Sequence, residues 1–532
     1  MTRSIDAPTL RADLLDGGEI TLVDVREQGL YGANHLLLAI NIPLSRLELD
    51  IRPMAPRLGT RVVLCDDSGG EAERAAEFLA AAGYSDISIL DGGVGAWGAA
   101  GFELFSGVNV PSKLFGEYVE HHCDTPNITA EELKAKQDAG EDVVVLDSRP
   151  IEEYRKMNIP GGIDAPGAEL AYRVRDLAPN PDTLVVVNCA GRTRSIIGAQ
   201  SLINAGTPNK VMALKNGTMG WHLAGFELEH GADRLWGPVS DQALSWSTAA
   251  TARVAERYGV ETIDAAGLER WRAEAEDHTL YLIDVRFPEE YRAGHLPGSR
   301  SAPGGQLVQA TDRYIATRGA RVVLIDDTGV RATMTAHWLV QMGWTYVRVL
   351  EGGLDGHDLE TGAHVPTAPE AAAVELATIA PAELQERLDA GTIAVVDVAD
   401  SISHRDGHIP GAQWAIRSRL ADAAGKLTKA EAYAIACPDA GLARLAGRDL
   451  AALTGAEVVL LEGGTAGWVE AGLPVEEGTD GALDEPVDRY YRAYDRKDGV
   501  EAAMNEYLDW EIELINQIER DGTLVFPAFP GP

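Results

Sequence analysis

The sequence is poor in cysteine, in basic residues and in long apolar runs. Its 532 residues contain four cysteines, and no two of them form a CxxC pair: Cys65, Cys123, Cys189 and Cys437. We therefore expect neither a structural zinc site nor a disulfide framework. No stretch approaches 18 uninterrupted apolar residues, so we expect no membrane-spanning helix. The N-terminal residues also lack an apolar signal core, which favours a cytoplasmic location.

The charge balance is strongly acidic. Lysine and arginine together number 46, against 82 aspartates and glutamates, which gives a net charge of -36. Such a chain repels nucleic acid phosphates and anionic membranes, so neither is an expected partner. An apolar fraction of 45% with 24% charged residues is ordinary for a globular protein. The length predicts several domains.

Three landmarks recur four times in the same order. The first is an apolar strand that ends in an acid, at Asp24, Asp147, Asp284 and Asp397. The second is an apolar strand that runs into a polar loop, which starts at Asp66, Cys189, Asp326 and Cys437. The third is a turn that starts at Gly92, Asn216, Gly352 and Gly463. The acid and the loop are 42 residues apart in three units and 40 in the fourth, so we expect four copies of one domain.

Each unit alternates strands and helices, which predicts an α/β fold with a mainly parallel sheet flanked by helices. The expected domains cover residues 1–108, 109–235, 236–370 and 371–477, with a tail over 478–532. Residues 108–125 are expected to link the first two domains. The tail contains one predicted amphipathic helix over 501–520, whose apolar stripe is expected to pack against a domain or a second subunit.

The loop of the second unit carries the strongest chemical signal. Cys189 stands at the end of a buried strand, Gly191, Arg192 and Arg194 follow it, and a helix begins near Ser195. Successive backbone N–H groups of such a loop, together with the helix N-terminus, form a concave anion site. A positive setting of this kind lowers a cysteine pKa from about 8.5 to roughly 3.5–7.5. The sequence therefore predicts a reactive thiolate beside a site for an anionic substrate.

This loop, with Asp147-x-Arg149 before it and Asn216-Gly217-x-x-x-Trp221 after it, resembles a rhodanese domain. The resemblance covers about nine tenths of the chain as four rhodanese-like units, and the whole is similar to multidomain rhodanese-related sulfurtransferases of bacteria. It implies that Cys189 takes a sulfane sulfur from thiosulfate or a related donor and becomes a persulfide. The sulfur then passes to a thiol or cyanide. The resemblance implies no metal and no cofactor.

The resemblance also implies roles for the residues around the cysteine. Cys189 is the nucleophile and sulfur carrier. The expected substrate-binding residues, which cradle the persulfide and the donor, are Ala190, Gly191, Arg192, Thr193, Arg194 and Ser195. Within that set, Arg192 and Arg194 are expected to bind the sulfonate end of the donor. Asp147 and Arg149 match family positions that are mostly structural, and we keep them as secondary site candidates.

The other three units depart from this pattern. Asp66 and Asp326 stand where the second unit has its cysteine, so the first and third units are expected to be inactive. Cys65 comes one residue early and is expected to point into the core. Cys437 is in register, but Leu442 replaces the arginine at the fifth position of its loop. A thiol without its anion cradle is a weak nucleophile, so Cys437 is a secondary candidate.

Two alternatives to an enzyme of sulfur transfer stay open. The degenerate units could recruit a partner of sulfur metabolism, with Cys189 only carrying a persulfide. Some rhodanese-fold proteins are phosphatases. Their active loop resembles this one but is one residue longer. The six residues from Cys189 to Arg194 favour sulfur over phosphate. The expected partners are a small anionic donor and a thiol or cyanide acceptor, and a homodimer through the tail or the degenerate units is a further expectation.

Overall fold

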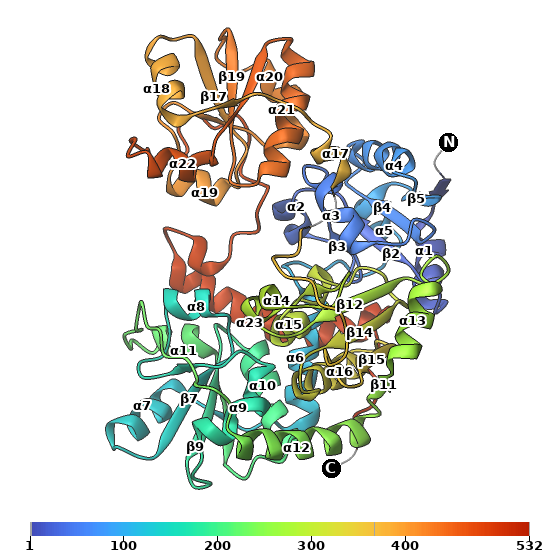
Figure 1. Ribbon diagram of the computed structural model, residues 1–532, viewed down its shortest axis with the longest axis vertical. Helices are drawn as coiled ribbons and strands as arrows, with labels where there is room; N and C mark the ends of the chain where they lie inside the picture. Colours follow the sequence, from blue (N-terminus) through green and yellow to red (C-terminus); the bar gives the residue numbers. More distant parts are fainter. Residues whose placement is uncertain (1–2, 366–367, 531–532) are drawn as a thin grey trace.

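The computed structural model describes residues 3–365 and 368–530. The ends of the expected ranges 1–108 and 478–532, and residues 366–367 within 236–370, lie outside this part. The chain forms four five-stranded sheets with one repeated strand order, β1-β5-β4-β2-β3 in the first, and every strand pair within them is parallel. Helices flank each sheet (Figure 1). The α/β fold class expected from the sequence is confirmed.

The first two domains have matching elements. Domain 1 contains β1 (Arg3–Ile5), α1 (Ala7–Leu15), β2 (Thr21–Asp24), α2 (Gln28–Ala33), β3 (Ile40–Asn41), α3 (Leu47–Met54), β4 (Arg61–Cys65), α4 (Glu71–Ala81), β5 (Asp86–Leu90) and α5 (Gly93–Ala99). Domain 2 contains β6 (Asn127–Ile128), α7 (Ala130–Asp138), β7 (Val143–Asp147), α8 (Ile151–Lys156), β8 (Ile163–Asp164), α9 (Glu169–Leu177), β9 (Leu184–Asn188), α10 (Thr193–Asn204), β10 (Val211–Leu214) and α11 (Gly217–Leu223).

The last two domains follow the same order with small changes. Domain 3 contains β11 (Glu261–Ile263), α13 (Ala265–Ala273), β12 (Leu280–Asp284), α14 (Pro288–Ala293), β13 (Arg300–Ser301), α15 (Gly304–Gln309), η1 (Thr311–Arg313), β14 (Arg321–Ile325), α16 (Val330–Gln341) and β15 (Tyr346–Leu350). The short α17 (Pro369–Ala372) precedes domain 4. Domain 4 contains β16 (Thr378–Ile379), α18 (Pro381–Asp389), β17 (Ile393–Asp397), α19 (Ser401–Asp406), β18 (Gln413–Trp414), η2 (Arg417–Arg419), α20 (Leu420–Ala424), β19 (Ala432–Ala436), α21 (Ala440–Thr454), β20 (Glu457–Leu461) and α22 (Gly464–Glu470).

The valine-rich strands form because both faces of each sheet are covered. Alternate residues of a strand point to opposite faces. In β9, Val185 and Val187 pack with Leu202 of α10 in one core cluster, whereas Val186 packs with Trp221 of α11 in another. A strand that is buried on both sides shows no polar alternation, which is why the sequence identified it.

Further helices lie outside the four repeats. The expected link over 108–125 contains a 14-residue helix, α6 (Val110–Cys123), and α12 (Asp241–Tyr258) precedes domain 3. The tail forms η3 (Ala493–Asp495) and then α23 (Val500–Asp521), which confirms the predicted helix almost residue for residue. This helix packs against α6 of its own chain. Its buried face includes Met504, Leu508, Glu511 and Leu514, whereas Ile512, which belongs to the predicted apolar stripe, is exposed.

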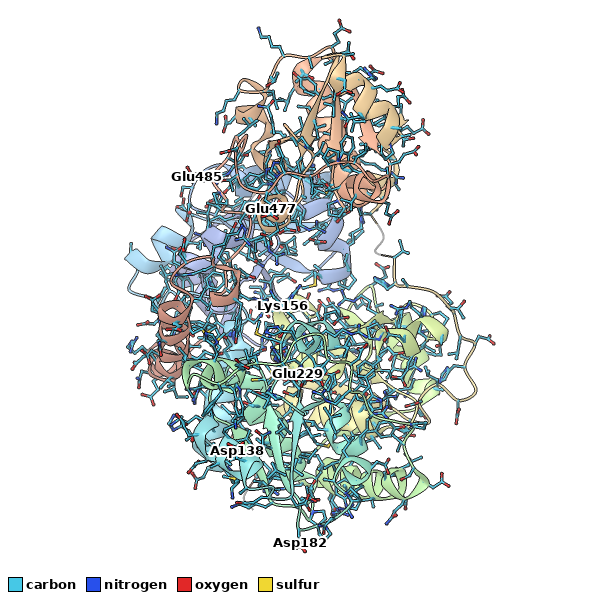
Figure 2. All side chains as sticks on the ribbon, turned by 90° about the vertical axis from the view of Figure 1, so that its left-hand side faces the viewer. Asp138, Lys156, Asp182, Glu229, Glu477 and Glu485 are labelled. Atoms are coloured by element: carbon cyan, nitrogen blue, oxygen red, sulfur yellow. The ribbon has the colours of Figure 1, made fainter. Side chains whose placement is uncertain are left out.

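The domains contact one another through buried charged pairs. Arg331 of domain 3 is fully buried and lies 2.9 Å from Glu169 of domain 2. Arg417 of domain 4 lies 2.6 Å from Glu48 of domain 1, and a short antiparallel bridge joins domains 1 and 3. In the side view domain 4 and domain 2 lie at opposite ends, with Lys156 near the middle (Figure 2). Within the described residues, no helix has the length and apolar character needed to cross a membrane.

Candidate active site

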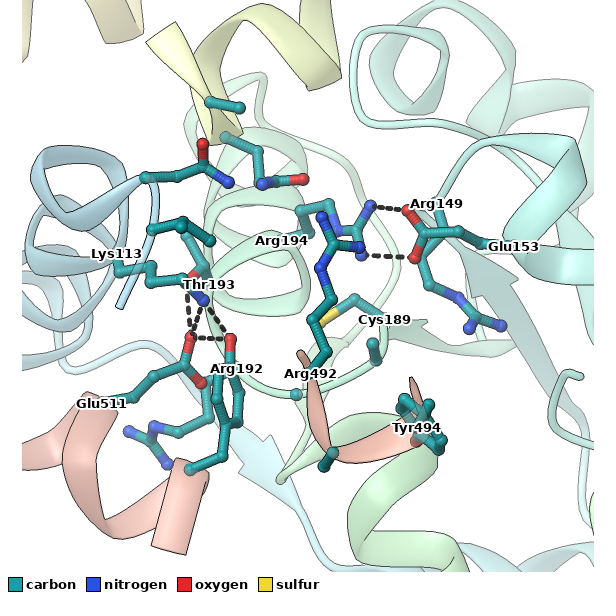
Figure 3. Close-up of a pocket in the computed structure, with 18 of the residues that line it drawn as sticks. Lys113, Arg149, Glu153, Cys189, Arg192, Thr193, Arg194, Arg492, Tyr494 and Glu511 are labelled. Atoms are coloured by element: carbon teal, nitrogen blue, oxygen red, sulfur yellow. Dashed lines mark hydrogen bonds and ion pairs between the residues drawn. The ribbon is translucent and has the colours of Figure 1, made fainter. Parts of the chain in front are cut away.

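Cys189 lies at the carboxyl end of β9, the central strand of its sheet, directly before the loop that leads into α10. Its side chain is buried, with 2% of the residue exposed. The thiol lines a cavity of about 220 Å³ whose wall includes the loop that follows it (Figure 3). The strand end predicted from the sequence is therefore the point where a buried sulfur meets a cavity.

The turn after β10 explains why glycine follows Asn216 in the sequence. Gly217 adopts a left-handed φ of 54°, and a Cβ atom there would lie 2.2 Å from the carbonyl oxygen of Cys189. Only glycine allows this close approach. The turn then binds the loop, since the N–H of Thr218 donates to the Cys189 carbonyl at 2.8 Å and that of Met219 to Ala190 at 3.0 Å. These bonds fix the backbone around the thiol.

The loop amides are the most informative feature of the site. Within the described part of the chain, the backbone N–H groups of residues 190–195 donate no hydrogen bond. They belong to the loop and to the first turn of α10, so they are donors that the helix itself cannot satisfy. A run of free amides at a helix N-terminus forms an anion-binding concavity. Of the set predicted from the sequence, Ala190 to Arg194 line the cavity and Ser195 does not, and anion binding by this set stays a prediction.

The two loop arginines are both paired with carboxylates. Arg192 is buried and donates to Glu117 of α6 at 2.7 and 2.8 Å, and it also contacts Glu120. Arg194 donates twice to Glu153 of α8 at 2.8 Å (Figure 3). Both line the cavity, but their guanidinium groups are already engaged. Sulfonate binding by these two arginines stays a prediction.

Glu153 is held as an anion at the cavity. Burial alone would raise the pKa of its carboxyl, but Arg194, Arg149 and Arg492 together lower that pKa to about 2. The pair with Arg194 is thus fully charged at neutral pH. Because it joins α8 to the first turn of α10, it supports the loop from the side opposite α6.

Asp147 and Arg149 form a buried pair at 2.7 Å. Asp147 also accepts a hydrogen bond from Asn188, and Arg149 donates to the carbonyl of Met157 at 2.5 Å. The same aspartate–arginine pair occurs in domains 1 and 3, at Asp24–Arg26 and Asp284–Arg286. Its presence beside loops without cysteine agrees with the structural role expected for it, although Arg149 also lines the cavity.

The two hydroxyl groups of the loop form hydrogen bonds with protein groups. Ser195 donates to the carbonyl of Arg192 at 2.8 Å, and Thr193 donates to Glu511 of α23 at 3.3 Å. Glu511 is buried and also accepts from Lys113 of α6 at 3.0 Å. Tyr507 of α23 contacts both Lys113 and Glu511. The tail helix thus forms part of the wall behind the loop.

Sequence reasoning missed this contribution from the linker and the tail. It identified an amphipathic helix near the C-terminus, and the helical spacing of its apolar residues was a correct signal for that helix. The cavity residues supplied by the linker and the tail are Val108, Asn109, Lys113, Tyr490, Arg492, Ala493, Tyr494, Asp495, Tyr507, Trp510 and Glu511. No local pattern in the sequence indicates which surface such a segment covers.

The other two cysteines of the repeat are set apart from Cys189 by their surroundings. Cys65 is fully buried in a core cluster with Leu22 and Trp97, which confirms the expected core position. Burial raises the pKa of the Cys65 thiol well above its ordinary value, and it raises that of Cys437 to about 12. Cys437 also contacts the carbonyl of Val398 at 3.7 Å. Both thiols are protonated at neutral pH and are therefore weak nucleophiles.

Comparison with known proteins places this site in a family. Four stretches match the rhodanese-like domain family: residues 7–100, 129–224, 265–358 and 380–471. The chain is 50% identical to the crystal structure of thiosulfate sulfurtransferase from Pseudomonas aeruginosa, over 99% of this chain and 100% of that one, with a TM-score of 0.94.

Curated relatives match shorter parts of the chain. A thiosulfate sulfurtransferase of Pseudomonas aeruginosa is 27% identical over 231 residues, which are 35% of this chain and 83% of that protein. An HTH-type transcriptional regulator of Mycobacterium tuberculosis is 37% identical over 105 residues, which are 20% of this chain and 45% of that protein. The chain thus spans about half the length of some of the curated proteins that it matches.

Proposed function

The chain belongs to the rhodanese-like family, and we propose that it is a thiosulfate sulfurtransferase whose sulfur carrier is Cys189. The observation that carries the proposal is that, in domain 2, a cysteine lies next to loop amides that donate no hydrogen bond among the described residues. The neighbour that matches almost the whole chain bears the name of that activity. The donor is a small dianion, and the acceptor is a thiophile such as cyanide or a thiol.

The proposed reaction has two displacement steps. The Cys189 thiolate attacks the sulfane sulfur of thiosulfate, an S–S bond forms to the enzyme, and the S–S bond of the donor breaks. Sulfite leaves with the electron pair. Cyanide then attacks the terminal sulfur of the persulfide, thiocyanate leaves, and the electron pair returns to Cys189 as thiolate. No external oxidant or reductant is needed.

The loop amides supply the electrostatic part of this chemistry. The persulfide is an anion, and so is each intermediate state of the transfer. Fixed N–H donors stabilise such charge without reorganising during the reaction. The residues proposed for this task are Ala190 to Ser195, by their backbone rather than their side chains.

A kinetic comparison tests the proposal. We expect wild-type protein to turn over thiosulfate and cyanide, and we expect Cys189→Ser to lose at least about 10³-fold in kcat/KM because no thiolate remains. Cys437→Ser is the matched control, since it removes an equivalent thiol from domain 4, and it is expected to retain full activity. Full activity in Cys189→Ser would overturn the assignment. Phosphate release from a phosphomonoester without sulfur transfer would favour the phosphatase alternative.

A further inference from the structure

The cavity beside Cys189 is rich in cations, although the chain as a whole is acidic. Its basic lining residues are Lys113, Arg149, Lys156, Arg192, Arg194, Arg313 and Arg492, and its acidic ones are Glu153, Asp495 and Glu511. Most of these cations are engaged. Lys113, Arg149, Arg192 and Arg194 each form an ion pair with a carboxylate. Among the described residues, the lining cations without an ion pair are Lys156, Arg313 and Arg492. Such an unpaired cation is the best suited to recognise a donor dianion.

Arg492 meets this requirement within the described part of the chain. Its guanidinium group has no ion pair or hydrogen bond there, and the residue is exposed. The side chain extends from the tail segment into the cavity, near the Cys189 sulfur and toward Arg194 (Figure 3). It also lines the adjoining cavity of about 630 Å³. Arg492 thus stands where the two cavities meet, opposite the free amides of the loop.

Hydrogen bonds from domain 4 and domain 2 hold the segment that carries Arg492. The N–H of Arg492 donates to the Asp495 carboxylate at 3.0 Å. Arg405, from α19 of domain 4, donates to the carbonyl of Asp495 at 2.8 Å. On the other side, the hydroxyls of Tyr494 and of Thr218 in domain 2 lie 3.0 Å apart. The catalytically silent domain 4 therefore holds a tail segment against the active site of domain 2.

We propose that Arg492 recognises the sulfonate end of the anionic donor, and that domain 4 positions it through Arg405. This inference rests on the proposed sulfurtransferase function and adds a specificity-determining residue from outside the rhodanese-like domains. The sulfane sulfur would face Cys189 and the loop amides, while the sulfonate oxygens accept hydrogen bonds from the guanidinium group. Charge-assisted bonds of this kind are among the strongest in proteins.

The test compares Arg492→Ala with Arg496→Ala in the thiosulfate:cyanide reaction. Arg496 lies in the same segment, is exposed, and lines neither cavity, so its removal changes the net charge equally. For Arg492→Ala we expect the KM for thiosulfate to rise about tenfold or more, the range of one lost charged hydrogen bond. The kcat is expected to change little, and Arg492→Lys should recover part of the loss. Arg496→Ala should behave as wild type.

Two further readouts separate recognition from a structural effect. The loss in Arg492→Ala should be smaller for a monoanionic donor such as methanethiosulfonate than for the thiosulfate dianion. Arg405→Ala should raise the KM in the same direction, with no added effect in the Arg405→Ala/Arg492→Ala double variant. Equal kinetics for Arg492→Ala and Arg496→Ala, or equal losses with both donors, would overturn the inference. Activity that survives Cys189→Ser would overturn the proposed function instead.

Discussion

Domain 2 and domain 3 carry six-residue loops at the same place in the fold, and both loops end in an arginine, Arg194 and Arg331. At the start of the loop domain 2 has Cys189, and domain 3 has Asp326 at the equivalent position. The Asp326 carboxylate accepts from the N–H groups of Gly329 at 2.6 Å and Arg331 at 2.9 Å. In domain 1 the carboxylate of Asp66 does the same for its own loop. In domains 1 and 3 the aspartate carboxylate is thus an internal anion that accepts hydrogen bonds from the loop amides. The corresponding amides of domain 2 are free.

The comparison also assigns a role to the arginine of the loop. Arg194 pairs with Glu153 in domain 2, and Arg331 pairs with the equivalent Glu290 in domain 3 at 2.7 Å. This ion pair is therefore present with and without a nucleophile. It supports the loop conformation in both domains, so the features that distinguish the domain 2 loop are its thiol and its free amides. Domain 4 follows the inactive pattern in another way, because Asp439 accepts from the N–H groups of its loop.

The largest expected effect comes from giving the domain 2 loop the first residue of the domain 3 loop. Cys189→Asp should lose at least about 10³-fold in thiosulfate:cyanide activity, since the nucleophile is gone and its carboxylate fills the cradle. The same change should leave the melting temperature unaltered or raise it, because free amides gain an acceptor. Activity assays and thermal unfolding check the two halves. A folded but strongly destabilised variant would mean that the loop amides of domain 2 do not accept a carboxylate at position 189.

The second prediction concerns the thiols. Burial raises the pKa of Cys437 to about 12, so its thiolate fraction at pH 8 is on the order of 10⁻⁴ and grows about tenfold for each unit of rising pH. Iodoacetamide at pH 8 should therefore modify Cys189 before Cys437, as followed by peptide mass spectrometry. Labelling in Cys189→Ser serves as the control. Equal rates at Cys437 and Cys189 would erase the distinction between the two domains.

The smallest expected effect is one of stability alone. Asp326→Ala removes the acceptor of the loop amides in domain 3, and unsatisfied buried donors cost about 1–3 kcal/mol. The free energy of unfolding should fall by about that amount, while sulfur transfer at Cys189 persists. Chemical denaturation and the standard assay measure both. Serine, which is smaller and accepts more weakly, gives a graded control as Asp326→Ser.

The repeat made most of the fold predictable. Four strands that end in acids at a constant spacing imply four parallel sheets, and the buried valines of β9 gave no polar alternation to confuse them with edge strands. The position of Cys189 at a strand end followed from the same register. The core position of Cys65 was predictable too, because a shift of one residue along a strand turns the side chain to the opposite face of the sheet.

The surroundings of the site were not predictable from local patterns. Glu117 and Glu511 approach the loop from 75 and 318 residues away, and Arg492 comes from a tail with no repeat to align it. The sequence showed Arg192 and Arg194 as two free charges beside a cysteine. It could not show that Glu117 and Glu153 neutralise them, because ion pairing between distant elements depends on tertiary packing.

The most direct test of the account is to find where sulfur resides after reaction with thiosulfate. Protein treated with thiosulfate and no acceptor, then trapped by alkylation and digested, should carry one additional sulfur atom on the Cys189 peptide and lose it when cyanide is added. The peptides of Cys65 and Cys437 should carry none. Sulfur on Cys437 with an unmodified Cys189 would contradict the claim that the open amide cradle of domain 2 is the seat of catalysis.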